Sequence, residues 1–464
     1  MSRKWWVLAA VACGTFMATL DSSIVNIALP TLTKAFGTDV VRVKWVVIVY
    51  VLVITCLLLI FGRLSDQYGR RRIFQWGFFV FILGSAFCSF SSDLIPLILA
   101  RAVQAVGASM LMANGPALIT AAFPASERGT ALGTMAMVVS AGLISGPSVG
   151  GLLISSFGWR SIFIVNIPVG MIGLLLVNHN VTRDHGLRNP APFDWAGAIL
   201  QTILLLSLIV LFDPPNISVS GSTPFLISRW FTAIAVLIVG MNFVKVEAEA
   251  KAPLLDLSLL KNRTFWSANV AGFLTFVWLS SVSILMPYFL EDVMHFPTHT
   301  SGIFMTAIPL TILVIAPISG RLSDTLGSRG LSFAGAIIGT LSLLIMSGSL
   351  GPGIDAQFSS FEIVALLATV GLAIGLFQSP NNNAIMGSVP SSKLGVASAL
   401  LATIRNLGLL IGTSLATGLF SWRMKETGDF VRSLHFTHTV GALIALGAML
   451  ASLIKRDEPR KSFG

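Results

Sequence analysis

The sequence predicts an all-α polytopic membrane protein with fourteen transmembrane helices arranged as six, two and six. The 464-residue chain is 54% hydrophobic and only 11% charged, whereas soluble domains carry roughly 25% charged residues. Apolar runs recur from end to end of the chain, and each is about 20 residues long, the length of a helix that crosses ~30 Å of hydrocarbon. A dense polar segment between two such runs, residues 62–72, has a near copy at residues 320–330. Together these features predict a membrane protein built from two related halves.

Each apolar run is expected to be a helix, because a lipid-exposed backbone must satisfy its own hydrogen bonds. The alternating pattern of membrane barrel strands is not visible in the sequence. An even number of spans places both termini on one side of the membrane. The predicted spans are residues 5–31, 44–62, 73–91, 94–121, 130–156, 161–179, 195–212, 224–244, 265–290, 301–320, 331–350, 361–386, 395–421 and 435–454.

The repeated polar segment defines the internal symmetry of the chain. Its two copies agree at six of their first eight residues and lie 258 positions apart. Ser22 and Ser23 in the first span likewise correspond to Ser280 and Ser281 in the ninth. The first six spans therefore match the last six, and the seventh and eighth match neither half. The predicted domains are a six-helix bundle over residues 1–180, two additional helices with linkers over 181–263, a second six-helix bundle over 264–456 and a tail over 457–464.

Orientation follows from the basic residues, which concentrate on the cytoplasmic side of membrane spans. With the N-terminus inside, 20 of the 30 lysines and arginines fall on the inner side and 8 on the outer side. Lys34, Arg42 and Lys44 in the first outer loop run against this rule. We therefore expect a multi-pass protein of the cytoplasmic (inner) membrane with both termini in the cytoplasm.

The same composition disfavours several kinds of partner. The net charge of +10 is explained by residues that flank membrane spans, and no basic face with interleaved aromatic residues favours nucleic acid. Cys13, Cys56 and Cys88 lie within apolar runs without metal-ligand spacing, so we expect them to pack in the core. No Gly-Lys pair occurs, and hence no P-loop. We expect a lipid bilayer as surroundings, no metal and no cofactor.

Four motifs follow one another along the first half of the chain. They occupy residues 20–30 in the first span, 62–72 after the second, 101–107 in the fourth and 142–151 in the fifth. They resemble the motifs of the major facilitator superfamily, specifically of its fourteen-span drug:proton antiporter branch. Ala105 stands where Gly is usual in the fourth-span motif. The resemblance covers nearly the whole chain and implies the major facilitator fold and transport by alternating access.

Asp21 is the only acidic residue well inside a span of the N-terminal half, and such residues are usually functional. The helical rise places Asp21 about 24 Å along the helix from Trp5, and Arg101 about 10 Å below the outer boundary. At this similar depth we expect Asp21 and Arg101 to form a proton-coupling pair. Burial favours a neutral Asp21 and a nearby Arg101 favours its charged form, so a change in surroundings would bind or release a proton. A structural role for either side chain is the alternative.

The fifth-span motif has glycines at steps of four and an embedded proline, which permit close helix approach and a kink. The resemblance implies a hinge or gate near the outer side that favours antiport. Ordinary tight packing is the alternative. The predicted hinge residues are Gly142, Gly146, Pro147, Gly150 and Gly151.

The polar segment after the second span supplies glycines for a turn and charges for a cytoplasmic gate. Its aspartate can accept from a helix N-terminus or an arginine, and its arginines can reach carboxylates or lipid phosphates. The alternative is that these arginines only set the topology. The predicted gate residues are Gly62, Arg63, Asp66, Gly69, Arg70, Arg71, Glu127 and Arg128.

A substrate cavity is expected near the midplane between the two halves. Arg405 lies near mid-membrane in the thirteenth span, where some exporters of this branch place acidic residues. The absence of acidic residues from that span weakens a prediction of organic-cation substrates. The predicted cavity residues are Asn26, Gln104, Trp278, Met305, Gln378, Asn382 and Arg405. Gln378 and Asn382 cluster with Asn381 and Asn383 around Pro380, where a satisfied broken helix end is the alternative. Ordinary packing is the alternative for Trp278 and Met305.

The leading functional hypothesis is a secondary active exporter that exchanges external protons for a small amphipathic drug or toxic compound. An alternative is an exporter of one physiological lipid, peptide or metabolite. A non-transporting membrane sensor or enzyme is disfavoured, because the sequence carries no nucleophile–base pair, metal cluster or cofactor fingerprint. The sequence leaves open whether a periplasmic adaptor takes part.

Overall fold

The computed structural model describes residues 3–123, 128–181, 194–212, 229–250, 259, 261–351, 353–355, 357–389 and 394–454. Within these ranges the chain is helical and contains no strand, which confirms the all-α prediction. Thirteen helices of these ranges are long and apolar enough to cross a membrane. A further predicted span coincides with α9 (Trp195–Phe212), whose apolar stretch Trp195–Leu208 is shorter. The predicted count of fourteen spans therefore agrees to within one.

The chain forms two compact units. The first comprises Met1–Leu254 and Leu290–Thr306, and the second comprises Leu255–Phe289 and Ala307–Gly464. The predicted division into six, two and six spans stays a prediction. The helices of the first unit are α1 (Arg3–Ala35), α2 (Val40–Val43), α3 (Trp45–Tyr68), α4 (Arg70–Phe90), α5 (Leu94–Ala122), α6 (Arg128–Phe157), α7 (Ser161–Ile164), α8 (Asn166–Asn180), α9, α10 (Arg229–Glu249) and α12 (Thr298–Met305). The helices of the second unit are α11 (Arg263–Tyr288), α13 (Ala307–Leu326), α14 (Ser328–Met346), α15 (Ser360–Gly387), α16 (Leu394–Thr427) and α17 (Phe430–Leu453). The π-helical turn Phe289–Val293 follows α11, and its residues from Leu290 on belong to the first unit.

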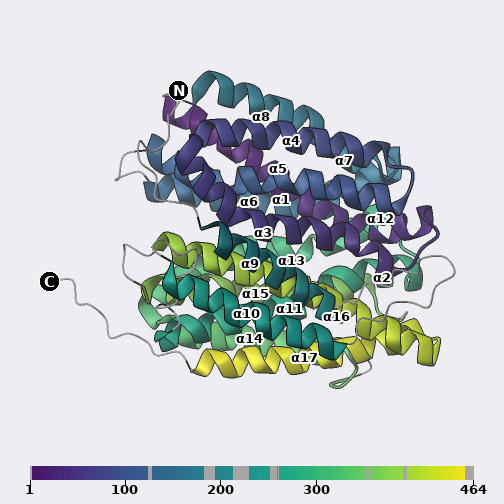
Figure 1. Ribbon diagram of the computed structural model, residues 1–464. Helices are drawn as coiled ribbons and strands as arrows, with labels where there is room; N and C mark the ends of the chain where they lie inside the picture. Colours follow the sequence, from purple (N-terminus) through teal and green to yellow (C-terminus); the bar gives the residue numbers. More distant parts are fainter. Residues whose placement is uncertain are drawn as a thin grey trace. The chain divides into compact units, whose positions relative to one another are not determined.

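Helix α1 contacts α5, α6 and α8 in the first unit. Helix α4 packs along both α5 and α8, and these helices run alongside one another in Figure 1. Phe74, Phe78 and Phe81 project from α4 into a core that also buries Met17 of α1 and Leu111 of α5. This apolar packing of α4 holds together α1, α5 and α8, the three helices that carry the buried polar residues described below.

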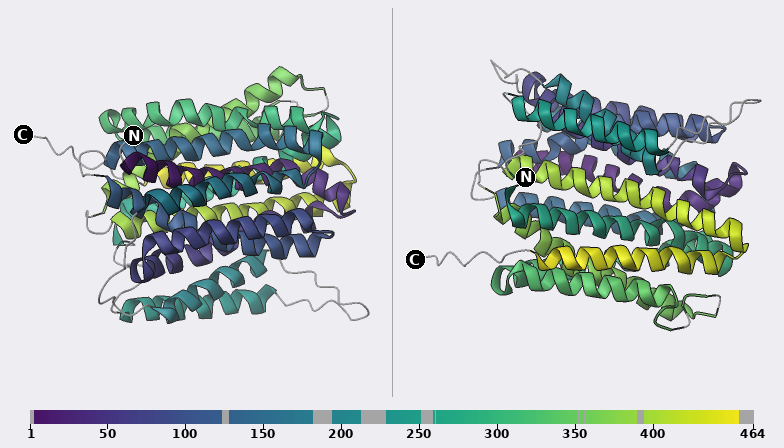
Figure 2. Two further views of the ribbon diagram at one scale, coloured as in Figure 1. Left: turned by 90° about the horizontal axis from the view of Figure 1, so that it is seen from above. Right: turned by 60° about the horizontal axis from the view of Figure 1, so that its bottom comes forward.

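Helices α9 and α10 form a pair within the first unit, drawn in teal in Figure 2. Gly197 near the start of α9 lies beside Glu247 near the end of α10. The two helices are therefore antiparallel. This is the arrangement expected for two consecutive membrane spans.

A one-residue turn, present in both units, replaces the longer polar loop that the sequence predicts over residues 62–72. Helix α3 continues to Tyr68, α4 begins at Arg70, and Gly69 separates them at φ +97°. In the second unit Gly327, 258 positions later, separates α13 from α14 at φ +85°. Glycine adopts this left-handed conformation without steric cost. The loop prediction was too long because polar residues can continue a helix beyond its apolar stretch.

Side-chain caps set the first residues of two helices in the second unit. The Oδ1 atom of Asn262 accepts the backbone N–H of Thr264 at 2.9 Å at the start of α11. Ser359 and Glu362 form a reciprocal capping box at the start of α15. Such caps satisfy backbone N–H groups that have no partner inside the helix. They position α11 and α15, two helices that line a polar pocket of this unit.

Glycines allow α4 and α5 to approach until their backbones touch. A Cβ atom on Gly84 would lie 2.5 Å from backbone atoms of Gln104, and one on Gly107 would overlap the backbone of Phe81. Helix association in lipid depends on this kind of close van der Waals packing. The position of Gln104 between the two helices therefore depends on the absence of a side chain at Gly84.

We predict that Gly84→Val destabilises the protein by about 2–3 kcal/mol, because the added carbons push α4 away from α5. Thermal unfolding of the purified protein in detergent measures the change. Gly418→Val is the matched control, since no atom lies within 4 Å of a Cβ built there. Equal melting temperatures for the two variants would contradict the prediction.

Candidate functional site

A carboxylate lies fully buried among three helices of the first unit. Asp21 of α1 forms an ion pair with Arg101 of α5, whose side chain is also buried. The Nε2 atom of Gln104 donates to Asp21 Oδ1 at 2.8 Å, and Asn166 Nδ2 of α8 donates to the same oxygen at 2.7 Å. We call Asp21, Arg101, Gln104 and Asn166 the buried polar cluster. It unites the two residues predicted for proton coupling with two amide side chains.

Arg101 is held in place by further contacts besides Asp21. Its Nε atom donates to the carbonyl of Val46 at 3.1 Å, and its Nη1 atom donates to Gln104 Oε1 at 2.6 Å. Its guanidinium lies 4.0 Å from the ring centroid of Tyr50, a distance at which a cation is attracted to the ring face. Both Val46 and Tyr50 belong to α3. The arginine therefore keeps partners that do not depend on the charge of Asp21.

Gln104 is oriented by contacts on both ends of its amide. The oxygen accepts from Arg101, and the nitrogen donates to Asp21 and to Ser85 Oγ of α4, the latter at 2.7 Å. The sequence predicts Gln104 as a cavity residue, but the structure buries it completely within this network. Its donors and acceptor are all used there. Gln104 therefore belongs to the buried polar cluster rather than to an open cavity wall.

Asn166 is a member of the cluster that the sequence reasoning missed. It is the first residue of α8, separated from the end of the short helix α7 by Val165 alone, and it is 1% exposed. Its Oδ1 atom has no hydrogen-bond partner among the described residues. The available signal was an amide inside the apolar run of the predicted sixth span, since polar residues within spans tend to be functional.

The predicted hinge glycines lie where α6 packs on α1. A Cβ atom on Gly142, Gly146 or Gly150 would overlap side chains of α1. The hydroxyl of Ser23, also on α1, donates to the carbonyl of Leu143 at 3.0 Å. These close contacts place α6 directly against the helix that carries Asp21.

The remaining hinge residues contact α12, also within the first unit. The carbonyl of Pro147 lies so near Gly302 that a Cβ atom there would overlap it. A Cβ atom on Gly151 would lie 2.8 Å from backbone atoms of α12. The hydroxyls of Ser148 and Thr306 are hydrogen-bonded at 2.6 Å. One face of α6 thus packs on α1 and another packs on α12.

The predicted gate residues are only partly described by the structure. Arg71 Nη2 donates to the carbonyl of Asn178 at the end of α8, at 2.9 Å, which suits a cation at a helix C-terminus. Arg63 and Arg70 are half-buried, Gly69 forms the turn, and Gly62 has open space around its Cβ position. The side chains of Asp66 and Arg128 and the whole of Glu127 lie outside the described residues.

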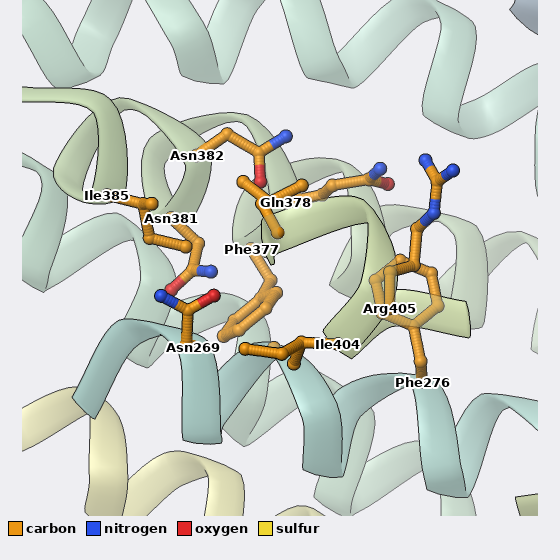
Figure 3. A pocket seen from close by; sticks show the side chains of 11 residues that line it. Asn269, Phe276, Phe377, Gln378, Asn381, Asn382, Ile385, Ile404 and Arg405 are labelled. Atoms are coloured by element: carbon orange, nitrogen blue, oxygen red, sulfur yellow. The ribbon is translucent and has the colours of Figure 1, made fainter. Parts of the chain in front are cut away.

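A polar pocket lies within the second unit between α11, α15 and α16. Its polar lining consists of Asn269 of α11, Gln378, Asn381 and Asn382 of α15, and Arg405 of α16. In Figure 3 the amides of Asn269 and Asn381 occupy one end of the view and the guanidinium of Arg405 the other. No acidic residue lines the pocket. The structure thus brings together three of the seven predicted cavity residues with Asn381 of the same predicted amide cluster, and it adds Asn269.

The apolar part of this pocket consists of two aromatic rings and aliphatic side chains. Phe276 and Phe377 line it together with Ile385 and Ile404. The pocket therefore offers planar aromatic walls beside its amides and guanidinium.

The other predicted cavity residues do not line this pocket. Trp278 is buried in α11 and packs near Gly339 of α14. Met305 is buried in α12 of the first unit, and Asn26 is half-buried on α1. Among the described residues no group of three or more histidines, cysteines or acidic residues is arranged to hold a metal ion.

Known proteins resemble this chain over nearly its whole length. It is 37% identical to the riboflavin transporter RibZ of Clostridioides difficile over 449 residues, 96% of this chain and 93% of that protein. It is 30% identical to the multidrug resistance protein Stp of Mycobacterium tuberculosis, covering 89% and 76% of the two chains. It is 28% identical to the multidrug efflux pump LfrA of Mycolicibacterium smegmatis, covering 99% and 88%.

The fold and the family follow from two further comparisons. The POT family transporter PepTSo, a solved structure, superposes with a TM-score of 0.72 at 15% identity, covering 97% of this chain and 96% of that one. The sequence profile of the Major Facilitator Superfamily matches residues 11–413. The multidrug relatives support the predicted drug-efflux branch. The chain is thus a multi-pass membrane transporter rather than an enzyme, and it belongs to the Major Facilitator Superfamily.

Proposed function

We propose that this chain is a proton-coupled secondary active transporter that exports amphipathic compounds by alternating access, with Asp21 as its proton-binding group. The observation that carries the proposal is the buried polar cluster. Removing a carboxylate and a guanidinium from water is costly, and the cost is offset only by close pairing and further hydrogen bonds. Asp21 has both. Such an arrangement suits a group whose charge is switched during transport.

The cluster can adapt to either charge state of Asp21. When Asp21 binds a proton, Arg101 loses its anionic partner but keeps the Val46 carbonyl, Gln104 and the Tyr50 ring. A half-turn of the Asn166 amide would then offer its unpartnered Oδ1 to the new O–H of Asp21. In the proposed cycle, a proton enters from the outer side and leaves on the inner side. Its movement drives the substrate in the opposite direction.

The two predicted gates have complementary duties in this proposal. The hinge residues of α6 keep the outer side closed through their contacts with α1 and α12, which would prevent a proton leak. The residues around Gly69 control the opposite, cytoplasmic side. With the turn at Gly69 on the cytoplasmic side, both termini also lie in the cytoplasm, and the protein lies in the inner membrane. The concentration of basic residues supports this orientation.

Substrate binding is assigned in this proposal to the pocket that Gln378, Asn382 and Arg405 line. The mixture of aromatic walls and amides suits an amphipathic compound. The multidrug names of two relatives support drug-like substrates. Asn26, Trp278 and Met305 remain proposed contributors to the wider cavity.

A second candidate function is transport of one physiological heterocycle. The riboflavin transporter that shares 37% identity with this chain favours it, as do the several amides of the pocket. Amide groups recognise the carbonyl and N–H edges of such rings through paired donors and acceptors.

Competition distinguishes this candidate from multidrug export. If the protein is a dedicated heterocycle transporter, a low concentration of unlabelled riboflavin should block uptake of radiolabelled riboflavin. Unrelated amphipathic dyes should not be transported. Measurement in proteoliposomes with an imposed pH gradient decides the matter. Transport of many dyes with weak riboflavin competition would reject the second candidate.

We expect Asp21→Asn to abolish dye accumulation driven by a pH gradient in proteoliposomes, because the amide cannot carry the proton. Exchange of dye against dye without a gradient should persist, since it requires no net proton movement. Asp93→Asn is the control, because Asp93 is an exposed residue at the start of α5. Gradient-driven accumulation that survives Asp21→Asn would rule out Asp21 as the coupling group.

Asn166→Ala should slow gradient-driven transport by about tenfold or more, because a hydrogen bond to a charged group is worth about 1.5–3 kcal/mol. Asn114→Ala removes an equally buried amide of α5 that donates only to the carbonyl of Met110 in its own helix. The two variants should melt at similar temperatures but transport at different rates. Equal rates would show that Asn166 has no part in coupling.

A further inference from the structure

Arg405 has no anionic partner in the part of the chain that the structure describes. Its side chain is half-buried on α16 at the pocket wall, and it makes no ion pair or hydrogen bond with any described residue. In the first unit, by contrast, Arg101 is neutralised by Asp21. Partial burial of a charge is unfavourable unless a counter-charge approaches it. A guanidinium left open beside a pocket is therefore suited to a negatively charged ligand.

The neighbouring amides add unused hydrogen-bonding groups. Gln378 and Asn382 line the pocket and make no hydrogen bond with other described residues. Asn269 is 4% exposed, and its Oδ1 atom has no partner among the described residues. Its amide nitrogen donates to the carbonyl of Phe265 in its own helix at 2.8 Å. The pocket thus offers donors around one positive charge, together with an acceptor at Asn269.

The apolar walls limit the shape of a ligand. The rings of Phe276 and Phe377 line the same pocket, and aromatic rings prefer to stack on other planar rings. These two rings favour a planar ring system over a long flexible chain. No carboxylate lines the pocket to attract an amine or a quaternary ammonium group.

We propose that this pocket binds an aromatic anion, with Arg405 bound to its carboxylate, sulfonate or phosphate group. Gln378 and Asn382 bind the carbonyl oxygens of its rings, and Asn269 accepts a ring N–H or hydroxyl. The planar guanidinium matches two anionic oxygens at once, which an ammonium group does not. The assignment rests on the proposed transport function and gives it a substrate class. Cationic compounds of the same shape are disfavoured by Arg405 itself.

Two dyes with the same xanthene ring system and opposite charge test this assignment. Fluorescein is the anionic probe and rhodamine 6G is the cationic probe. Their binding to the purified full-length protein in detergent is followed by fluorescence anisotropy. Fluorescein should bind at least about tenfold more tightly than rhodamine 6G, which corresponds to about 1.4 kcal/mol.

Variants of Arg405 then test whether its charge causes the preference for fluorescein over rhodamine 6G. Arg405→Gln should weaken fluorescein binding by about tenfold or more, and Arg405→Lys should retain part of it because the charge remains. Arg423→Gln is the control, since Arg423 is half-buried as Arg405 is, does not line the pocket and is paired with Glu426 at 2.8 Å. Each variant is first compared with the unsubstituted protein by thermal unfolding, and a loss of binding counts only where the melting temperature is unchanged. Should Arg405→Gln prove unstable, the affinity retained by Arg405→Lys and the preference of the unsubstituted protein between the two dyes decide the test.

The assay also separates this inference from the proton-coupling proposal. Asp21→Asn should still bind fluorescein and still prefer it to rhodamine 6G, because Asp21 does not line the pocket. Absence of fluorescein binding, preference for rhodamine 6G, or an unchanged affinity in Arg405→Gln would overturn the aromatic-anion assignment while leaving proton coupling intact. If the unsubstituted protein binds fluorescein but shows no transport driven by a pH gradient, only the coupling proposal is overturned.

Discussion

The ion pair between Asp21 and Arg101 is the constraint on which the first unit depends. Two opposite charges within an apolar helix bundle are tolerated only when each is closely paired and hydrogen-bonded. The structure meets this requirement with amides from α5 and α8 and with a carbonyl and an aromatic ring from α3. Small residues serve the same end, since Gly84 allows α4 to reach Gln104. The packing of this unit can therefore be understood as a shell around one carboxylate.

The internal repeat preserves the scaffold but not the charges. Gly69 and Gly327 form the same left-handed turn between equivalent helices, 258 positions apart. At the same spacing, Leu279 stands where Asp21 stands in the first half. The second unit instead carries Arg405, without a carboxylate partner among its described residues. We infer a division of labour in which the first unit handles the proton and the second recognises the charge of the substrate.

Much of the fold was predictable because lipid imposes a simple rule on sequence. A helix must be apolar over about 20 residues to cross the membrane, so hydropathy alone located nearly every span. The extent of the turn at Gly69 was not predictable in this way, because residues 62–68 are mostly polar and yet helical. Hydropathy reports the surroundings of a residue, whereas a helix ends where its backbone conformation changes.

The candidate site was only partly predictable, for a different reason. Asp21 and Arg101 stood out because a charge in an apolar run is rare. Asn166 and Asn269 did not, since an amide in a span is common and its partner depends on packing between distant helices. Gln104 shows the same limit: its motif drew attention to it, but only the fold showed that its amide bonds Asp21 and Ser85. Amide roles thus require the tertiary structure.

The most direct test of the central claim is proton release by the purified protein. In weakly buffered detergent solution with a pH-sensitive dye, addition of a transported compound should displace protons from the unsubstituted protein, because substrate and proton compete across the cycle. The account predicts that Asp21→Asn binds the same compound and releases none. Equal proton release from both proteins would contradict the assignment of Asp21 as the coupling group.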